Sequence, residues 1–189
     1  MQIAQMTLEK VVLVDAQDNE IGLMEKQEAH ERGALHRAFS VFVFNSAGEL
    51  LLQRRAFHKY HSGGLWTNTC CSHPRPGEDN LQAAKRRLQE EMGFTCKLDQ
   101  VFSFLYHQKV GELIEHELDH VFVGTFDDDP AINPMEVAEW KSISLPELQA
   151  DLAMHPENYT VWFRLCLERV LHHRRGDAGE SSGLISFIS

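Results

Sequence analysis

Histidine and carboxylate residues are spaced along the chain in a pattern that could bind a metal ion. His30 and His36 precede a predicted strand, His73 follows a pair of cysteines, and Glu115 and Glu117 alternate within ELIEHELDHVFVG. Residues two apart on a strand face the same side, so both glutamates can point at one ion. Three imidazoles with two carboxylates suit zinc, manganese, iron or magnesium, not calcium. With 11 histidines in the chain, ordinary surface or core positions for some of them stay open as an alternative.

A second pattern combines a loop with a helix. Residues 72–94, SHPRPGEDNLQAAKRRLQEEMGF, can be laid on the Nudix box, G-x5-E-x7-R-E-U-x-E-E-x-G-U, where U is a bulky apolar residue. Ser72 stands where the box has Gly, and Arg87 stands where it has Glu. Arg87 and Glu91 are four apart and share one helix face, so a cation lies beside a carboxylate that could hold a metal against a diphosphate. The positions in register are Glu78, Arg86, Leu88, Glu90, Glu91, Gly93 and Phe94. An ordinary amphipathic helix with an Arg/Glu pair is the alternative.

Residues 116–120, HELDH, also spell H-E-x-x-H, the signature of zinc proteases. That signature works on a helix, where histidines four apart can grip one zinc ion. Here it runs directly into the β-rich segment VFVGTF. On a strand His116 and Glu117 point to opposite faces, so we reject the protease interpretation.

Composition narrows the class of protein. The chain has 189 residues, 43% of them hydrophobic, and a net charge of -10, which together indicate one globular domain and argue against a nucleic-acid partner. Residues 26–87 reverse the sign with ten basic against five acidic residues, which indicates a small polyanionic ligand or a solvated basic face. Four cysteines without a CxxC pair suggest neither a disulfide framework nor a zinc ribbon. No leader pattern and no apolar run of the ~18 residues that span a membrane is present, so we expect a cytosolic protein without a membrane partner.

The elements that must position these residues are mixed. Alternating apolar segments predict strands in KVVLVDAQDNEIG, AFSVFVFNSAGELLLQRR, QVFSFLYHQ and LDHVFVGTFDDD. Helices are predicted over residues 78–92, behind a capping box at Ser144 and Glu147, and over residues 159–173. The order predicts an α+β fold with a mixed β-sheet core flanked by helices. We expect a single domain over residues 1–175 and a loosely ordered tail over 176–189.

Taken together, these motifs resemble the type I isopentenyl-diphosphate isomerases, which have a Nudix-like fold. The resemblance covers residues 11–162 and rests on LHRAFSVFVFN, LLLQRR, GLWTNTCCSHP, the altered box with Arg87, and Glu115-x-Glu117 before VFVGTF. It implies a prenyl diphosphate as the small-molecule substrate. It also implies that five residues bind the catalytic divalent metal (manganese, zinc or magnesium), namely His30, His36, His73, Glu115 and Glu117.

The resemblance implies further roles. Glu91 would hold a magnesium ion bridging to the substrate diphosphate, and Cys71 and Glu117 would be the acid/base pair. Tyr106 would place its hydroxyl beside the double bond, and Trp162 would cover the developing cation. The residues expected to contact the diphosphate are Lys26, Arg55, Lys59 and Arg87.

The chemistry requires such parts. Moving an alkene double bond needs one proton added and another removed two carbons away, through a tertiary carbocation. An indole face stabilises positive charge, and a dry pocket keeps water from quenching it. Two alternatives stay open: a Nudix hydrolase of a nucleoside or prenyl diphosphate, and a non-catalytic diphosphate-binding protein of the same fold. The sequence leaves the oligomeric state open.

Overall fold

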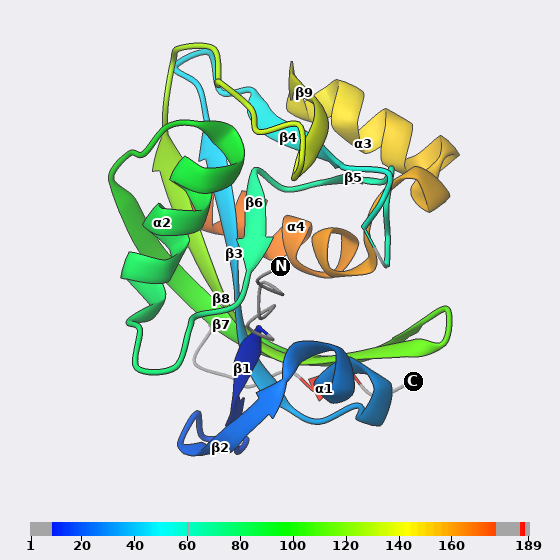
Figure 1. Ribbon diagram of the computed structural model, residues 1–189. Helices are drawn as coiled ribbons and strands as arrows, with labels where there is room; N and C mark the ends of the chain where they lie inside the picture. Colours follow the sequence, from blue (N-terminus) through cyan, green and yellow to red (C-terminus); the bar gives the residue numbers. More distant parts are fainter. Residues whose placement is uncertain (1–8, 60, 177–185, 188–189) are drawn as a thin grey trace, which may run out of the picture.

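The computed structural model describes residues 9–59, 61–176 and 186–187 (Figure 1). Its strands are β1 (Lys10–Val14), β2 (Glu20–Glu25), β3 (His36–Phe44), β4 (Leu50–Arg55), β5 (Trp66–Thr67), β6 (Cys70–Ser72), β7 (Leu98–Val110), β8 (Leu113–Thr125), β9 (Val137–Ile143) and β10 (Ser186–Phe187). Its helices are α1 (Lys26–Arg32), α2 (Asn80–Met92), α3 (Leu145–Met154), the 3-10 turn η1 (Pro156–Asn158) and α4 (Val161–Arg174). Much of the expected tail lies outside the described residues, although β10 within it pairs in parallel with β7.

The strands form one mixed sheet, as the sequence predicts. Strand β3 pairs in parallel with β8 and antiparallel with β1, β4 and β6, and β8 pairs antiparallel with β7. Within the described residues, no helix is long and apolar enough to cross a membrane.

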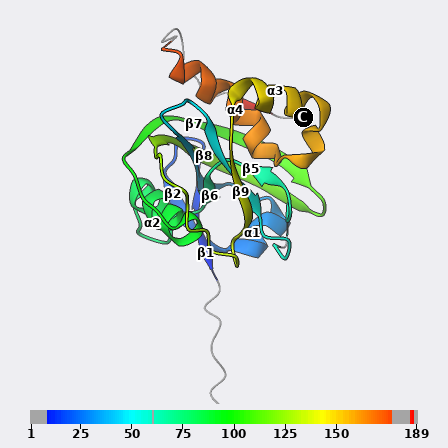
Figure 2. The same ribbon diagram turned by 90° about the horizontal axis from the view of Figure 1, so that it is seen from above.

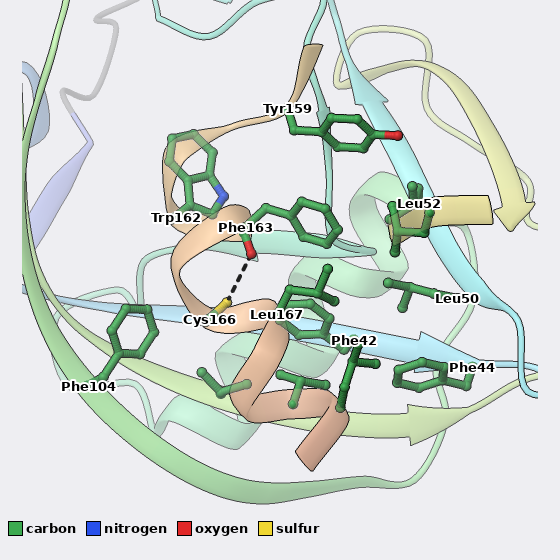
Figure 3. Packing of buried hydrophobic residues seen from close by; sticks show 14 of the residues in the cluster. Phe42, Phe44, Leu50, Leu52, Phe104, Tyr159, Trp162, Phe163, Cys166 and Leu167 are labelled. Atoms are coloured by element: carbon green, nitrogen blue, oxygen red, sulfur yellow. Dashed lines mark hydrogen bonds between the residues drawn. The ribbon is translucent and has the colours of Figure 1, made fainter. Parts of the chain in front are cut away.

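Strand β3 is buried on both faces, which explains its nearly continuous apolar sequence. Because successive side chains alternate, Phe39 and Val41 pack in one core with α2, whereas Phe42 and Phe44 pack in a second core with α4. Figures 1 and 2 show α2 and α4 on opposite sides of the sheet. Figure 3 shows Phe42 beside Leu167 of α4 in the second core.

Helix α2, which carries the altered box, has well-defined ends. The Asp79 side chain accepts hydrogen bonds from the first-turn amides, so the helix begins at Asn80 and not at the predicted residue 78. Gly93 ends it with a φ of 76°, in the left-handed region. A Cβ there would lie 2.2 Å from the carbonyl oxygen of Ala131, so no larger residue fits. This close approach explains why glycine stands at this position of the box.

Helices α3 and α4 pack on the same side of the sheet, against the second core. The predicted capping box forms, with Ser144 and Glu147 bonded reciprocally at the start of α3. Helix α4 begins two residues later than predicted because Tyr159 is extended and bridges to Trp66. Its buried positions include Trp162, which packs in the second core from the first turn of the helix (Figure 3).

Candidate active site

Three of the predicted ligand histidines come together from separate elements. His30 lies on α1, His36 begins β3, and His73 follows β6; their ring centroids are 4.8 to 5.6 Å apart. The Nδ1 atom of His30 donates to the carbonyl of Lys26 at 2.6 Å, and that of His36 donates to Ala34 at 2.8 Å. A carbonyl can only accept, so these bonds fix the proton on Nδ1 and leave each Nε2 lone pair facing the cluster.

The two predicted carboxylates join this cluster from one face of β8. Glu117 lies opposite His36 in the parallel β3–β8 register, and its Oε1 is 3.4 Å from Nε2 of His36 and 2.8 Å from Nε2 of His73. Glu115, two residues earlier, places Oε2 3.4 Å from Nε2 of His30. Both glutamates thus lie on one face of β8, beside the histidines.

Burial sets the protonation of this cluster. Burial alone would raise the pKa of Glu117, but the adjacent imidazoles of His36 and His73 outweigh it and hold that pKa well below its usual range. Burial and the neighbouring charge of Glu117 raise the pKa of Glu115. Burial lowers the pKa of His73 to about 3, because the uncharged imidazole is favoured away from water. A neutral imidazole keeps the lone pair that a metal needs.

The donor set fits a divalent transition metal. Ligand atoms of His30, His36, His73 and Glu117 all lie within 4.8 Å of one another, and each residue is buried. Neutral imidazoles and carboxylates are ligands of zinc and manganese, and a cation would offset the two buried negative charges. Glu91 stands apart: within the described residues it belongs to no such group, and its oxygens accept from Arg87 and from Gln53.

The zinc-protease signature is not assembled. His116 lies on β8 and faces away from Glu117, with Nδ1 donating to the Gly33 carbonyl. His120 contacts Asp18 at 3.1 Å. Neither histidine joins the cluster, so the rejection of the protease interpretation is confirmed.

The adjacent cysteines face opposite sides of β6. Cys70 is fully buried in the core with α2, whereas Cys71 lines a cavity together with His73. Burial raises the pKa of the Cys71 thiol to about 12, despite the opposing charge of Arg55, so the thiol keeps its proton at neutral pH. The Cys71 sulfur lies 3.9 Å from Nη1 of Arg55.

The cationic residues expected to contact a diphosphate surround the same cavity, which has a volume of about 480 Å³. Three of these residues form ion pairs with acidic neighbours: Lys26 with Glu9, Lys59 with Glu136, and Arg87 with Glu91 and Glu136. The Arg55 guanidinium lies 5.3 Å from the Trp162 ring centroid. All four cations line the cavity, namely Lys26, Arg55, Lys59 and Arg87.

Tyr106 and Trp162 occupy different positions relative to the cavity. Trp162 lines it, with Nε1 donating to Thr67 Oγ1 at 3.0 Å. Tyr106 is fully buried on β7 and is not among the cavity-lining residues; its hydroxyl donates to Glu117 Oε2 at 2.5 Å. The hydroxyl therefore reaches the cavity through the carboxylate of Glu117.

Sequence reasoning missed several residues of the site. Asp119 continues the Glu115 and Glu117 alternation, is buried, and accepts from Ser40 at 2.8 Å; the period of two could have revealed it. Glu136 contacts Lys59, and His61 contacts Glu115. Both lie in irregular segments, where no residue pattern in the sequence indicates a role.

Comparison with known proteins identifies the class of fold. The NUDIX domain model matches residues 34–165. Among solved structures, a Deinococcus radiodurans protein is 20% identical with a TM-score of 0.65, covering 77% of this chain and 90% of its own. The MutT protein of Methanosarcina mazei is 22% identical with a TM-score of 0.60, covering 77% and 96%. The chain is therefore a Nudix-domain protein.

Closer relatives define the family within that class. A protein of Aromatoleum aromaticum called isopentenyl-diphosphate Delta-isomerase 2 is 56% identical over 88% of either chain. The isopentenyl-diphosphate Delta-isomerase of Pectobacterium atrosepticum is 52% identical over 94% of this chain and 99% of its own. The chain belongs to the isopentenyl-diphosphate Delta-isomerase family.

Proposed function

We propose that this chain interconverts isopentenyl and dimethylallyl diphosphates. The family supports this activity, and one observation of the site carries it: Cys71, Glu117 and Trp162 line a single cavity together with four cationic residues. A diphosphate held by the cations would extend its small apolar tail toward the thiol, the carboxylate and the indole.

The reaction moves a double bond without breaking the carbon skeleton. A proton adds to the terminal alkene carbon, positive charge develops on the tertiary carbon, and a proton leaves the carbon next to it on the diphosphate side. Cys71 and Glu117 are the proposed pair that exchanges these protons, in either direction. Tyr106 holds the second oxygen of Glu117 and so orients the carboxylate. The π face of Trp162 stabilises the cation by up to ~2 kcal/mol.

The metal site is part of the proposal. His30, His36, His73, Glu115 and Glu117 would hold one divalent ion, whether zinc, manganese or magnesium. When bound, such an ion supplies fixed positive charge that makes Glu117 a weaker base and stabilises its ionised form. Glu91 would hold a magnesium ion together with oxygens of the substrate diphosphate. It is the only carboxylate of α2 that lines the cavity in the described residues, so the diphosphate would have to supply further oxygen ligands.

The diphosphate takes no part in bond making. Lys26, Arg55, Lys59 and Arg87 would exchange contacts with protein carboxylates for contacts with its oxygens, which anchors the reacting tail in a defined orientation. Such an anchor excludes water once the substrate is bound, and this protects the carbocation.

An isotope experiment tests the proposal against both alternatives. Purified protein is incubated in D₂O with isopentenyl diphosphate, magnesium and zinc or manganese, and the products are followed by NMR. An isomerase gives dimethylallyl diphosphate carrying deuterium and releases no phosphate. Release of phosphate or diphosphate would instead indicate a Nudix hydrolase. Binding in calorimetry without deuterium exchange would indicate a non-catalytic binding protein.

We infer that residues 1–175 act as a single catalytic domain, which contains the whole family match. A small, water-borne diphosphate substrate fits the cytosolic setting expected from the sequence. The proposed activity requires no nucleic acid and no membrane partner.

A further inference from the structure

His61 brings a further imidazole to the metal cluster. It lies in the loop between β4 and β5, and its side chain is 9% exposed. Its Nε2 is 3.2 Å from Glu115 Oε1, and its ring centroid is 5.4 Å from that of His30. Ligand atoms of His30, His61 and Glu115 lie within 4.8 Å of one another, so these residues form a second donor group beside the first.

The two donor groups share His30, so they can bind one common ion but not two separate ions at once. Both contain His30, whose Nδ1 is already bonded to the Lys26 carbonyl at 2.6 Å. Only Nε2 of His30 is left to bind metal, and one lone pair binds one ion. Glu115 lies between the two imidazoles, with Oε2 3.4 Å from Nε2 of His30 and Oε1 3.2 Å from Nε2 of His61.

We propose that His61 is a direct ligand of the metal ion, so that the centre of this chain contains four imidazoles instead of three. This rests on the metal site of the proposed function. A site richer in nitrogen favours zinc, cobalt or manganese over magnesium, because imidazole is a softer ligand than a carboxylate or water.

Ligation by His61 would also connect the loop between β4 and β5 to the metal ion. Lys59, two residues earlier in the same loop, lines the cavity, and Arg55 Nη2 donates to the His61 carbonyl at 3.5 Å. Metal binding would therefore hold in place a segment that carries two of the cations expected to contact the diphosphate.

Metal affinity gives the first test. Wild type, His61→Ala and His58→Ala are stripped with a chelator and titrated with Zn²⁺ against a chromophoric competitor, without substrate. His58 is the matched control, because it belongs to the same loop and lines the same cavity but lies outside both donor groups. We expect His61→Ala to raise the dissociation constant by about tenfold or more, as loss of a ligand or of its partner does. His58→Ala should stay near wild type, and an unchanged constant for His61→Ala would overturn the proposal.

Cobalt substitution separates ligation from mere orientation of Glu115. Each imidazole bound to Co²⁺ contributes one exchangeable ring N–H proton that is strongly shifted in the NMR spectrum. Four such signals in wild type and three in His61→Gln, with unchanged circular dichroism, are expected. Three signals in both proteins would show that His61 is no ligand, even if affinity falls. His36→Ala tests the site itself: if it kept full metal affinity, the metal site of the proposed function would fail, independently of His61.

Discussion

Arg87 offers the sharpest test of how the substrate is held. Its side chain is 17% exposed, and its guanidinium contacts Glu91 and Glu136 at the cavity. In the substrate complex, Arg87→Ala removes one largely desolvated charge-assisted contact with the diphosphate, a loss of roughly 2 to 4 kcal/mol. At about 1.36 kcal/mol per tenfold, KM should rise about 30- to 900-fold. The vacated Glu91 would face the anion, which acts in the same direction.

An anchoring role for Arg87 predicts a change in KM rather than in kcat. Arg87 is not one of the proposed proton-transfer groups, so kcat at saturating substrate should change only a few-fold. Arg86 is the matched control, because it is the preceding residue of α2 with 19% exposure and bonds to Glu78 outside the cavity. Arg86→Ala should reduce stability and leave KM near wild type. An Arg87→Ala enzyme with unchanged KM would refute the anchoring role, and Arg87→Glu should be worse than alanine.

Three further predictions address the thiol, the metal and acid stability. Cys71→Ser should fold and keep its metal but lose ~10²-fold or more in kcat, whereas Cys70→Ser should stay within a few-fold in activity or only lose stability; an active Cys71→Ser enzyme would remove the thiol from the mechanism. His73→Ala should lose both metal, by elemental analysis, and activity; full retention of either would contradict the site. The Arg86 hydrogen bond lowers the pKa of Glu78, so its stabilising effect is complete above the ordinary value of 4.5 and fades as pH falls through the lowered pKa. In urea denaturation the gap between wild type and Glu78→Gln should therefore be present at pH 7 and shrink below about pH 4.5; a gap unchanged by pH would contradict it.

The parts of the site that follow a period were predictable from the sequence. Alternation on β8 puts Glu115 and Glu117 on one face, and alternation on β6 separates Cys70 from Cys71. Helical spacing likewise puts Arg87 beside Glu91. These features depend only on local backbone geometry, which a residue pattern records.

Contacts between distant segments were not predictable in the same way. Glu136 meets Lys59 and Arg87 across 77 and 49 residues, because β9 pairs with β4 and brings the loop before it over α2. His61 reaches Glu115 from an irregular loop, whose path depends on the packing around it. The two-residue errors at the starts of α2 and α4 arose where a side-chain cap or a bridge fixes the boundary more strongly than composition does.

Under the proposed function, the altered box would let this Nudix scaffold anchor a diphosphate without cleaving it. Hydrolysis needs several carboxylates to gather metal ions around the bond to be broken and to activate water. Here Arg87 occupies one of those positions, and Glu91 already accepts from both Arg87 and Gln53. The helix therefore offers positive charge and a single carboxylate to the diphosphate. The proposed proton-transfer pair lies instead on the sheet, where Cys71 on β6 and Glu117 on β8 line the same cavity. In this proposal, α2 contributes to diphosphate binding, whereas β6 and β8 carry the groups that transfer protons. Substitutions in α2 should therefore change KM, and substitutions on β6 and β8 should change kcat.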